Sequence, residues 1–152
     1  MKKKPEVGIV ILNWNNYDDT AECINSLDKV EYQEYKIIVV DNGSSDRSGE
    51  RLQKEFDDYE FVFSEKNRGF AGGCNLGIDH AVENGVDHVL LMNNDITVSP
   101  DFLEPLVKTI EHNQRVAAVG SVIYEGKTNI VWDAGGEMRP YIADVTRYKQ
   151  VK

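Results

Sequence analysis

The sequence predicts an α/β fold: a doubly wound, mostly parallel sheet with helices on both faces. First, residues 37–40 are all β-branched and show no polar alternation, which is typical of a strand covered on both faces, and the runs 7–12 and 86–92 also indicate strands. Second, these runs alternate with helical patterns, which favours a parallel sheet over a sandwich or a bundle. The length of 152 residues, 41% of them hydrophobic, predicts a single domain.

The first part of the chain contains two similar strand–helix units. The strand at 7–12 is followed by a helical pattern over 21–27, with its apolar residues on one face. The strand at 36–40 is β-branched throughout after its first residue, and it leads through a Ser-rich turn into a helix at 49–56.

The remaining elements continue this alternation until the pattern weakens after residue 128. Residues 141–152 mix aromatic, charged and β-branched residues and contain no clear signal for the end of a strand or a helix, so we expect that the chain is truncated there. The further expected elements are a strand at 61–63, a helix over 68–84 that starts Gly-rich, a strand at 86–92, a helix capped by Ser99 with Pro100 in its first position, and a strand over 116–124.

Composition excludes several classes of protein. A net charge of -9 disfavours binding to nucleic acid through phosphates. The apolar run at 7–12 is too short for a signal peptide or a transmembrane segment, so we predict a cytoplasmic protein and leave peripheral association with the inner face of the membrane open. Cys23 and Cys74 have no CxxC partner, which indicates two free thiols.

Two carboxylates mark a candidate site. Asp41 and Asp95 each follow an apolar strand, and the carboxyl ends of parallel strands meet at one edge of the sheet, where α/β proteins bind ligands. Asp95 could hold a hard divalent cation together with substrate phosphates. Trp14, after the first strand, could stack on a nucleobase. The alternatives are that both aspartates only cap turns and that Trp14 packs on the core.

A Gly-rich segment begins beside Arg68. Its glycines match neither GxGxxG nor the P-loop pattern, which disfavours dinucleotide and ATP binding. They could let the backbone approach a ligand or let a helix pack closely on the sheet, and Arg68 could contact phosphate or solvent. The glycines are Gly69, Gly72, Gly73 and Gly77.

Four blocks of sequence, taken together, resemble glycosyltransferase family 2, an inverting family with the GT-A fold. They are VGIVILNWNN at 7–16, VVDNGSSD at 39–46, NRGFAGGCNLGI at 67–78 and LLMNNDITVSPDFL at 90–103. Their order and spacing make the resemblance specific, and it covers roughly the first two thirds to four fifths of the chain. Asn42 and Asn93 replace aspartates that are common in the family, a variation similar to that of the rhamnosyltransferase-like branch.

The resemblance implies a site for a nucleoside-diphosphate sugar. Asp95 falls at the family's metal-binding position and would bind Mg²⁺ or Mn²⁺ on the diphosphate, where the metal acts as a Lewis acid. The base would lie among Trp14 and its neighbours, Asp41 and Asn42 would contact base or ribose, and Arg68 and the glycines would flank the nucleotide. The residues assigned to the nucleotide are Leu12, Asn13, Trp14, Asn15, Asp41, Asn42, Arg68, Gly73 and Asn94.

By the same resemblance, the function is inverting, metal-dependent transfer of a sugar from dTDP-rhamnose or a UDP-sugar to a saccharide, cell-envelope or lipid-linked acceptor, and the likeness to the rhamnosyltransferase-like branch favours dTDP-rhamnose. The family's general base lies beyond the metal motif, and none of Asp133, Glu137 and Asp144 fits its pattern. We therefore assign no catalytic residue and expect the donor-binding part alone, truncated before the acceptor-binding part. One alternative is a non-catalytic nucleotide-sugar binding module; another, disfavoured by the missing GxGxxG, is a Rossmann-like oxidoreductase.

Overall fold

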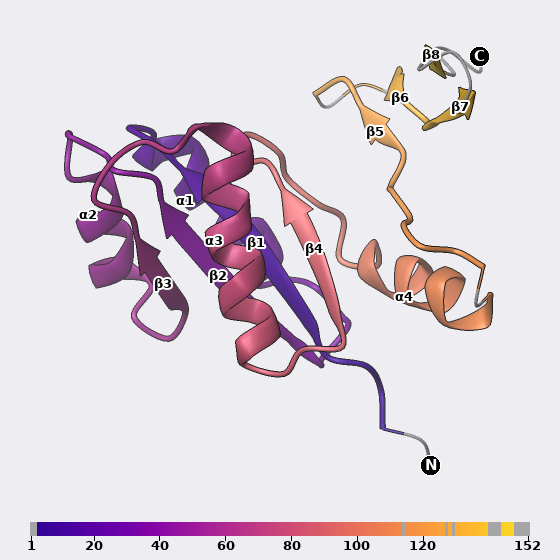
Figure 1. Cartoon of the computed structure of the whole chain (residues 1–152), viewed down its shortest axis with the longest axis horizontal. Coiled ribbons are helices and arrows are strands. Elements are labelled where there is room, and N and C mark those ends of the chain that lie inside the picture. The colour runs from indigo at the N-terminus through magenta and orange to yellow at the C-terminus, as the bar shows by residue number, and fades with distance from the viewer. Residues whose placement is uncertain (1–2, 114, 127, 129, 140–143, 148–152) are drawn as a thin grey trace. The chain divides into compact units, whose positions relative to one another are not determined.

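The computed structural model describes residues 3–113, 115–126, 128, 130–139 and 144–147. The chain divides into two compact units, Met1–Asp101 and Phe102–Lys152. The first unit alternates strands and helices (Figure 1). Its elements are β1 Val7–Asn13, α1 Tyr17–Leu27, β2 Tyr35–Asp41, α2 Ser48–Glu55, β3 Glu60–Phe63, α3 Gly69–Glu83 and β4 His88–Met92.

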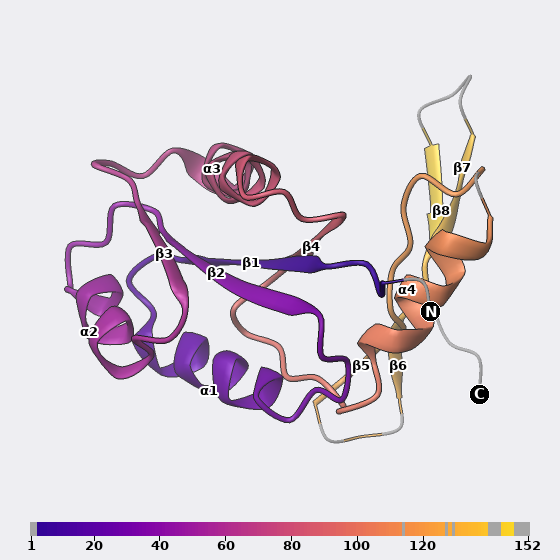
Figure 2. The same ribbon diagram turned by 90° about the horizontal axis from the view of Figure 1, so that it is seen from below.

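The first unit is built on a four-stranded parallel sheet in the order β3-β2-β1-β4. The register places Asn13, the last residue of β1, beside Asp41, the last residue of β2. Figure 2 shows α3 on one face of the sheet and α1 and α2 on the other. The predicted doubly wound α/β fold is therefore confirmed, and the carboxyl ends of the strands share one edge.

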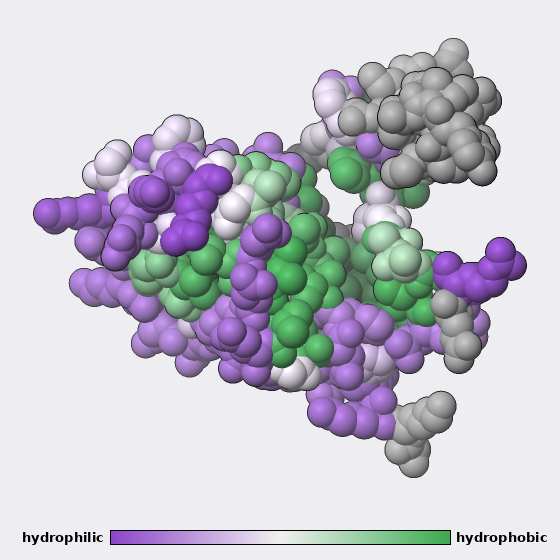
Figure 3. Space-filling view, viewed as in Figure 1, coloured by the Kyte–Doolittle hydropathy of each residue, from purple (hydrophilic) through white to green (hydrophobic). Residues whose placement is uncertain are grey.

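The core of this unit lies between the sheet and its helices. Val10, Ile38, Val40 and Ala81 form a buried cluster between the two central strands and α3. A Cβ atom at Gly77 would lie 2.3 Å from Val10 Cγ1, so this glycine lets α3 approach the sheet closely. Figure 3 shows hydrophobic surface in the middle of the face that carries α3.

In its described residues, the second unit contains one helix and two short antiparallel pairs of strands. Its β5–β6 hairpin is apolar but exposed, with Trp132 61% accessible. No helix in the described part of the chain is long and apolar enough to cross a membrane. The elements of the second unit are α4 Leu103–His112, β5 Ile123–Tyr124, β6 Val131–Asp133, β7 Gly136–Arg139 and β8 Asp144–Arg147.

Two predicted elements differ from the structure, the helix after Ser99 in its start and the strand over 116–124 in its length. The helix expected to start after Ser99 begins only at Leu103. The Pro100 carbonyl instead accepts a hydrogen bond from the Glu31 N–H at 2.9 Å, so the chain is still in a turn at this point. The strand expected over 116–124 is reduced to the two residues of β5, because the described residues 116–122 pair with no other strand.

The predicted ragged end at 141–152 lies largely outside the described residues, since 141–143 and 148–152 are not among them. The single domain and the truncation before an acceptor-binding part stay predictions. The other elements of the first unit occur where they were predicted: α1 begins four residues before the pattern at 21–27, and the remaining boundaries agree within about two residues, which is the usual uncertainty.

Candidate functional site

A pocket of about 470 Å³ opens in the first unit at the carboxyl edge of the sheet. Its walls come from the segments that follow β1, β2 and β4 and from the start of α3. Asp95 is the only carboxylate among the lining residues. They are Leu12, Trp14, Asn16, Asn42, Asn67, Gly69, Phe70, Asn93, Asn94 and Asp95.

Two aromatic side chains line this pocket and are exposed. Trp14 is 53% accessible and Phe70 is 64% accessible. Large exposed aromatic rings in a concave site offer flat apolar faces for a planar ligand. Trp14 was predicted to take this position, whereas Phe70 was missed. The signal that could have found it is an aromatic residue directly after Gly69 in a segment otherwise made of small residues.

Asn13 and Asp41, both predicted to bind the nucleotide, lie beneath the pocket and do not line it. Asn13 is fully buried, and its Nδ2 donates to Asp41 Oδ1 and to Ser48 Oγ, each at 2.8 Å. The second Asp41 oxygen accepts from the Ser44 N–H at 3.0 Å. Thr20 Oγ1 lies 3.0 Å from Asn13 Oδ1. These two side chains therefore connect β1 and β2 to the helices on the α1 and α2 face.

Asn42 connects β2 to the start of α3. Its Oδ1 accepts from the Arg68 N–H at 2.9 Å, and its Nδ2 donates to the Gly69 carbonyl at 3.1 Å and to Asn67 Oδ1 at 3.2 Å. A Cβ atom at Gly73 would lie 2.4 Å from Leu12 Cδ1. Gly73 thus allows α3 to pack behind the pocket wall, which favours the packing explanation for this glycine.

Arg68 and Asn15 also lie outside the lining. The Arg68 side chain is exposed, and its Nε donates to Ser64 Oγ at 3.1 Å. Asn15 Oδ1 accepts from the Ser45 N–H at 2.8 Å and supports the turn after β2. Both side chains are therefore placed by contacts within the protein, at the margin of the predicted site.

The loop after β4 is held from below by α1. Asn94 Nδ2 donates to Thr20 Oγ1 at 2.8 Å, and Cys23 Sγ lies 3.7 Å from the Asn93 carbonyl oxygen. Burial, and secondly the negative charge of Asp95, raise the pKa of the Cys23 thiol to about 12. The thiol therefore stays protonated near neutral pH and can donate a weak hydrogen bond to that carbonyl.

The structure separates the predicted residues into two groups and adds a third. The pocket brings together Leu12, Trp14, Asn42, Asn94 and Asp95. Its lining leaves out Asn13, Asn15, Asp41, Arg68 and Gly73. It includes Gly69, one of the glycines expected to flank the nucleotide, and adds Asn16, Asn67, Phe70 and Asn93, which were not assigned to the nucleotide although they lie in the same sequence blocks.

The donor set at Asp95 suits a cation shared with a ligand. Among the described residues, no group of three or more histidines, cysteines, aspartates and glutamates could hold a metal ion by itself. Magnesium, however, is often bound by one or two carboxylates together with substrate phosphates and water. The exposed Asp95 carboxylate and the amides of Asn93 and Asn94 fit that mode of binding.

The sequence matches a known protein family over nearly its whole length. The model of the family described as "Glycosyl transferase family 2" matches residues 8–150. The chain belongs to glycosyltransferase family 2. This membership confirms the resemblance of the four sequence blocks at the level of the family, and it leaves the Rossmann-like oxidoreductase without support.

Curated proteins are similar to this chain over most of its length. The poly-β-1,6-N-acetyl-D-glucosamine synthase of Staphylococcus aureus (strain MSSA476) is 26% identical over 142 residues, which cover 86% of this chain and 34% of the relative. The synthase of the same name from Staphylococcus epidermidis is 27% identical over 128 residues, 82% of this chain and 30% of the relative. The chain therefore spans about a third of the length of these relatives.

Solved structures share the GT-A fold of the family. S. aureus TarS in complex with UDP-GlcNAc has a TM-score of 0.60 and 22% identity, with 72% of this chain and 32% of that chain covered. The mannosyltransferase PcManGT from Pyrobaculum calidifontis, in complex with GDP-Man and Mn²⁺, has a TM-score of 0.60 and 21% identity, with 71% and 33% covered.

Proposed function

We propose that this chain is the donor-binding part of an inverting, metal-dependent glycosyltransferase that transfers a sugar from a nucleoside-diphosphate sugar to a saccharide, cell-envelope or lipid-linked acceptor. The observation that carries the proposal is the pocket at the carboxyl edge, because it combines two exposed aromatic rings with one exposed carboxylate, Asp95. The rings suit a nucleobase and the carboxylate suits a cation on a diphosphate. We expect a cytoplasmic location for this reaction.

We assign the aromatic residues of the pocket to the base of the donor and the polar residues after β4 to the cation. Trp14 and Phe70 provide flat apolar faces on which a base can stack. Asp95, with the amides of Asn93 and Asn94, would hold Mg²⁺ or Mn²⁺ against the diphosphate. When bound there, the cation supplies Lewis acidity for the departing diphosphate. PcManGT, whose structure contains GDP-Man and Mn²⁺, supports this assignment by its similar fold.

A UDP-sugar is the donor that we favour over dTDP-rhamnose. TarS is known in complex with UDP-GlcNAc, and the curated relatives are N-acetylglucosamine polymer synthases. Asn42 and Asn93 remain the only support for a rhamnosyltransferase-like branch. The lining of the pocket gives no indication of the chemical nature of the acceptor.

Calorimetric titration with UDP and dTDP, each with and without Mn²⁺, tests this proposal. We expect UDP to bind at least about tenfold more tightly with Mn²⁺ than without it, because the diphosphate oxygens complete the ligand set of a cation held by Asp95. Asp95→Asn should abolish the gain from Mn²⁺, whereas Asp79→Asn, which removes an exposed acid of α3 outside the pocket, should not. Absence of Mn²⁺-dependent binding of either nucleotide to the wild-type chain would refute the proposal.

The two tryptophans of the chain give a second matched pair. Both are more than half exposed, but of the two only Trp14 lines the pocket. Trp14→Ala should weaken UDP binding roughly tenfold even without metal, in the range expected for loss of base–aromatic stacking. Trp132→Ala should leave the affinity unchanged. Equal effects of the two substitutions would contradict the assignment of Trp14 to the base.

A second candidate is a non-catalytic nucleotide-sugar binding module. It is favoured by one observation: Asp95 is the only acidic residue of the pocket lining, so no second carboxylate there is available as a general base. Transfer of sugar from a UDP-sugar to any acceptor by this chain alone would exclude that candidate. Binding of donor without transfer would favour it.

A further inference from the structure

A series of buried and partly buried hydrogen bonds runs beneath the pocket and connects the ends of three strands. After β4, Asn94 Nδ2 donates to Thr20 Oγ1 of α1 at 2.8 Å. Thr20 Oγ1 lies 3.0 Å from Asn13 Oδ1, at the end of β1. Asn13 Nδ2 in turn donates to Asp41 Oδ1, at the end of β2. The Thr20 hydroxyl therefore joins the loop that carries Asp95 to the two central strands.

The direction of these bonds follows from the capacity of a hydroxyl, which donates one hydrogen and accepts up to two. Thr20 Oγ1 accepts from Asn94 and also lies 2.6 Å from the Asn16 carbonyl oxygen. Its hydrogen can serve either that carbonyl or Asn13 Oδ1. Asn13 is fully buried, and no other donor to its Oδ1 is found among the described residues. Leaving that oxygen unpaired is unfavourable, so donation to Asn13 is preferred.

We infer that Thr20 is a positioning residue for Asp95: its hydroxyl fixes Asn94 and thereby the carboxylate next to it in the sequence. This inference rests on the proposed function, in which Asp95 holds the cation. Thr20 is itself fully buried and does not line the pocket, so it acts only through Asn94. Groups that orient metal ligands from behind typically change metal affinity by about 10- to 100-fold when they are removed.

Two substitutions of Thr20 separate the role of its hydroxyl from that of its shape. Thr20→Val keeps the shape of the side chain and removes the hydroxyl, whereas Thr20→Ser keeps the hydroxyl. Ser26→Ala is a matched control, because Ser26 lies on the same helix and its Oγ accepts from the Val98 N–H at 3.2 Å, in the same loop but beyond Asp95. Thermal unfolding first establishes that each variant is folded.

In calorimetry with UDP, we expect Thr20→Val to weaken the Mn²⁺-dependent affinity about tenfold and to leave metal-free UDP binding nearly unchanged. Thr20→Ser and Ser26→Ala should keep both affinities. A purely structural role would not separate the two affinities in this way. If folded Thr20→Val keeps the Mn²⁺-dependent affinity of the wild type, the inference is wrong.

Hydrogen exchange without any ligand separates this inference from the proposed function. We expect faster exchange over residues 92–98 in Thr20→Val than in Thr20→Ser, and unchanged exchange there overturns the positioning role whatever the ligand is. Should Thr20→Val fail to fold, Asn94→Ala removes the other partner of the same hydrogen bond, a residue that is only half-buried. This variant must then accelerate exchange in the same segment. If the wild type shows no Mn²⁺-dependent UDP binding, the proposed function fails instead.

Discussion

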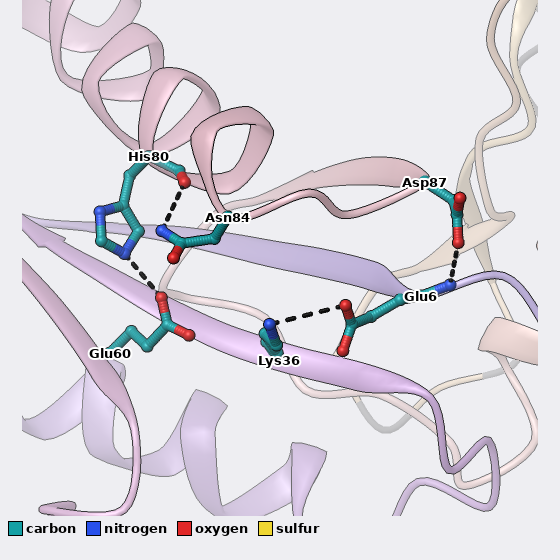
Figure 4. A network of polar contacts seen from close by, with 6 residues as sticks. All are labelled: Glu6, Lys36, Glu60, His80, Asn84 and Asp87. Carbon is teal, nitrogen blue, oxygen red and sulfur yellow. Dashed lines mark hydrogen bonds and ion pairs between the residues drawn. The ribbon is translucent and has the colours of Figure 1, made fainter.

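Polar side chains lie at both ends of the parallel strands, at the carboxyl edge and at the amino edge of the sheet, but their arrangements differ. At the carboxyl edge, neutral amides and hydroxyls around Asp41 form a buried network beneath a pocket. At the amino edge, the contacts join partly exposed side chains: Lys36 forms an ion pair with Glu6 at 3.5 Å, and His80 Nε2 lies 2.6 Å from Glu60 Oε2 (Figure 4). Exposed ion pairs contribute little to stability, whereas buried polar groups must be satisfied. In this unit, the buried polar network is the one that lies beside the pocket, whereas none of the side chains of these two pairs lines it.

The largest expected difference between the edges is in stability. Asn13→Leu removes the amide that serves Asp41, Ser48 and Thr20, so the free energy of unfolding should fall by about 3 kcal/mol or more. Lys36→Met, the matched change at the amino edge, should lower it by less than about 1 kcal/mol. Urea denaturation measures both. Similar losses in the two variants would remove the distinction between the edges.

An intermediate effect distinguishes two glycines on α3. A Cβ atom at Gly77 would meet Val10 Cγ1 at 2.3 Å and Val40 Cγ2 at 2.9 Å, both stiff buried side chains, so Gly77→Ala should destabilise by about 1–3 kcal/mol. At Gly73 the nearest atom is Leu12 Cδ1 at 2.4 Å, the flexible end of a side chain that lines the pocket, and Asn42 lies farther away at 3.1 Å. Gly73→Ala should therefore destabilise less than Gly77→Ala and weaken UDP binding several-fold.

Urea denaturation and calorimetry of the two alanine variants check this contrast. If Gly77→Ala weakens UDP binding and Gly73→Ala does not, the pocket wall has been placed on the wrong part of α3. The open position of Gly120, where an added Cβ meets nothing within 4 Å, offers a control substitution outside the helix.

The smallest effect is expected at the amino edge. In a double-mutant cycle of Glu60→Gln and His80→Gln, the coupling energy should be below about 1 kcal/mol and should decrease in high salt, because both side chains are partly exposed. A coupling above about 2 kcal/mol would mean that this edge is organised as strongly as the other. Urea denaturation at two salt concentrations gives the measurement.

Sequence alone predicted the sheet and the edge that carries the pocket, because apolar β-branched runs such as residues 37–40 have few alternatives to a buried strand. It also placed Asp41 and Asp95 at the ends of strands. What it could not show is which face of the sheet each polar side chain takes, since that depends on the exact residue at which a strand ends.

Side chains alternate between the faces of a strand, and this alternation separates the predicted site residues. Leu12 and Asn42 contact the side of α3, where the pocket opens. Asn13 and Asp41, paired in the register, point instead toward α1 and α2. A shift of one residue would exchange the two sets, so a motif of adjacent polar residues cannot distinguish ligand contacts from supporting contacts.

The Thr20–Asn94 hydrogen bond joins residues 74 positions apart in the chain, and the Asn13–Ser48 bond joins residues 35 apart. Contacts of such long sequence separation close large loops, which makes them slow to form. We therefore expect the carboxyl edge to be completed late in folding, after β1 and β2 have paired. Followed over time, the urea experiment on Asn13→Leu would show this as faster unfolding with little change in the refolding rate, whereas slower refolding would place the network early.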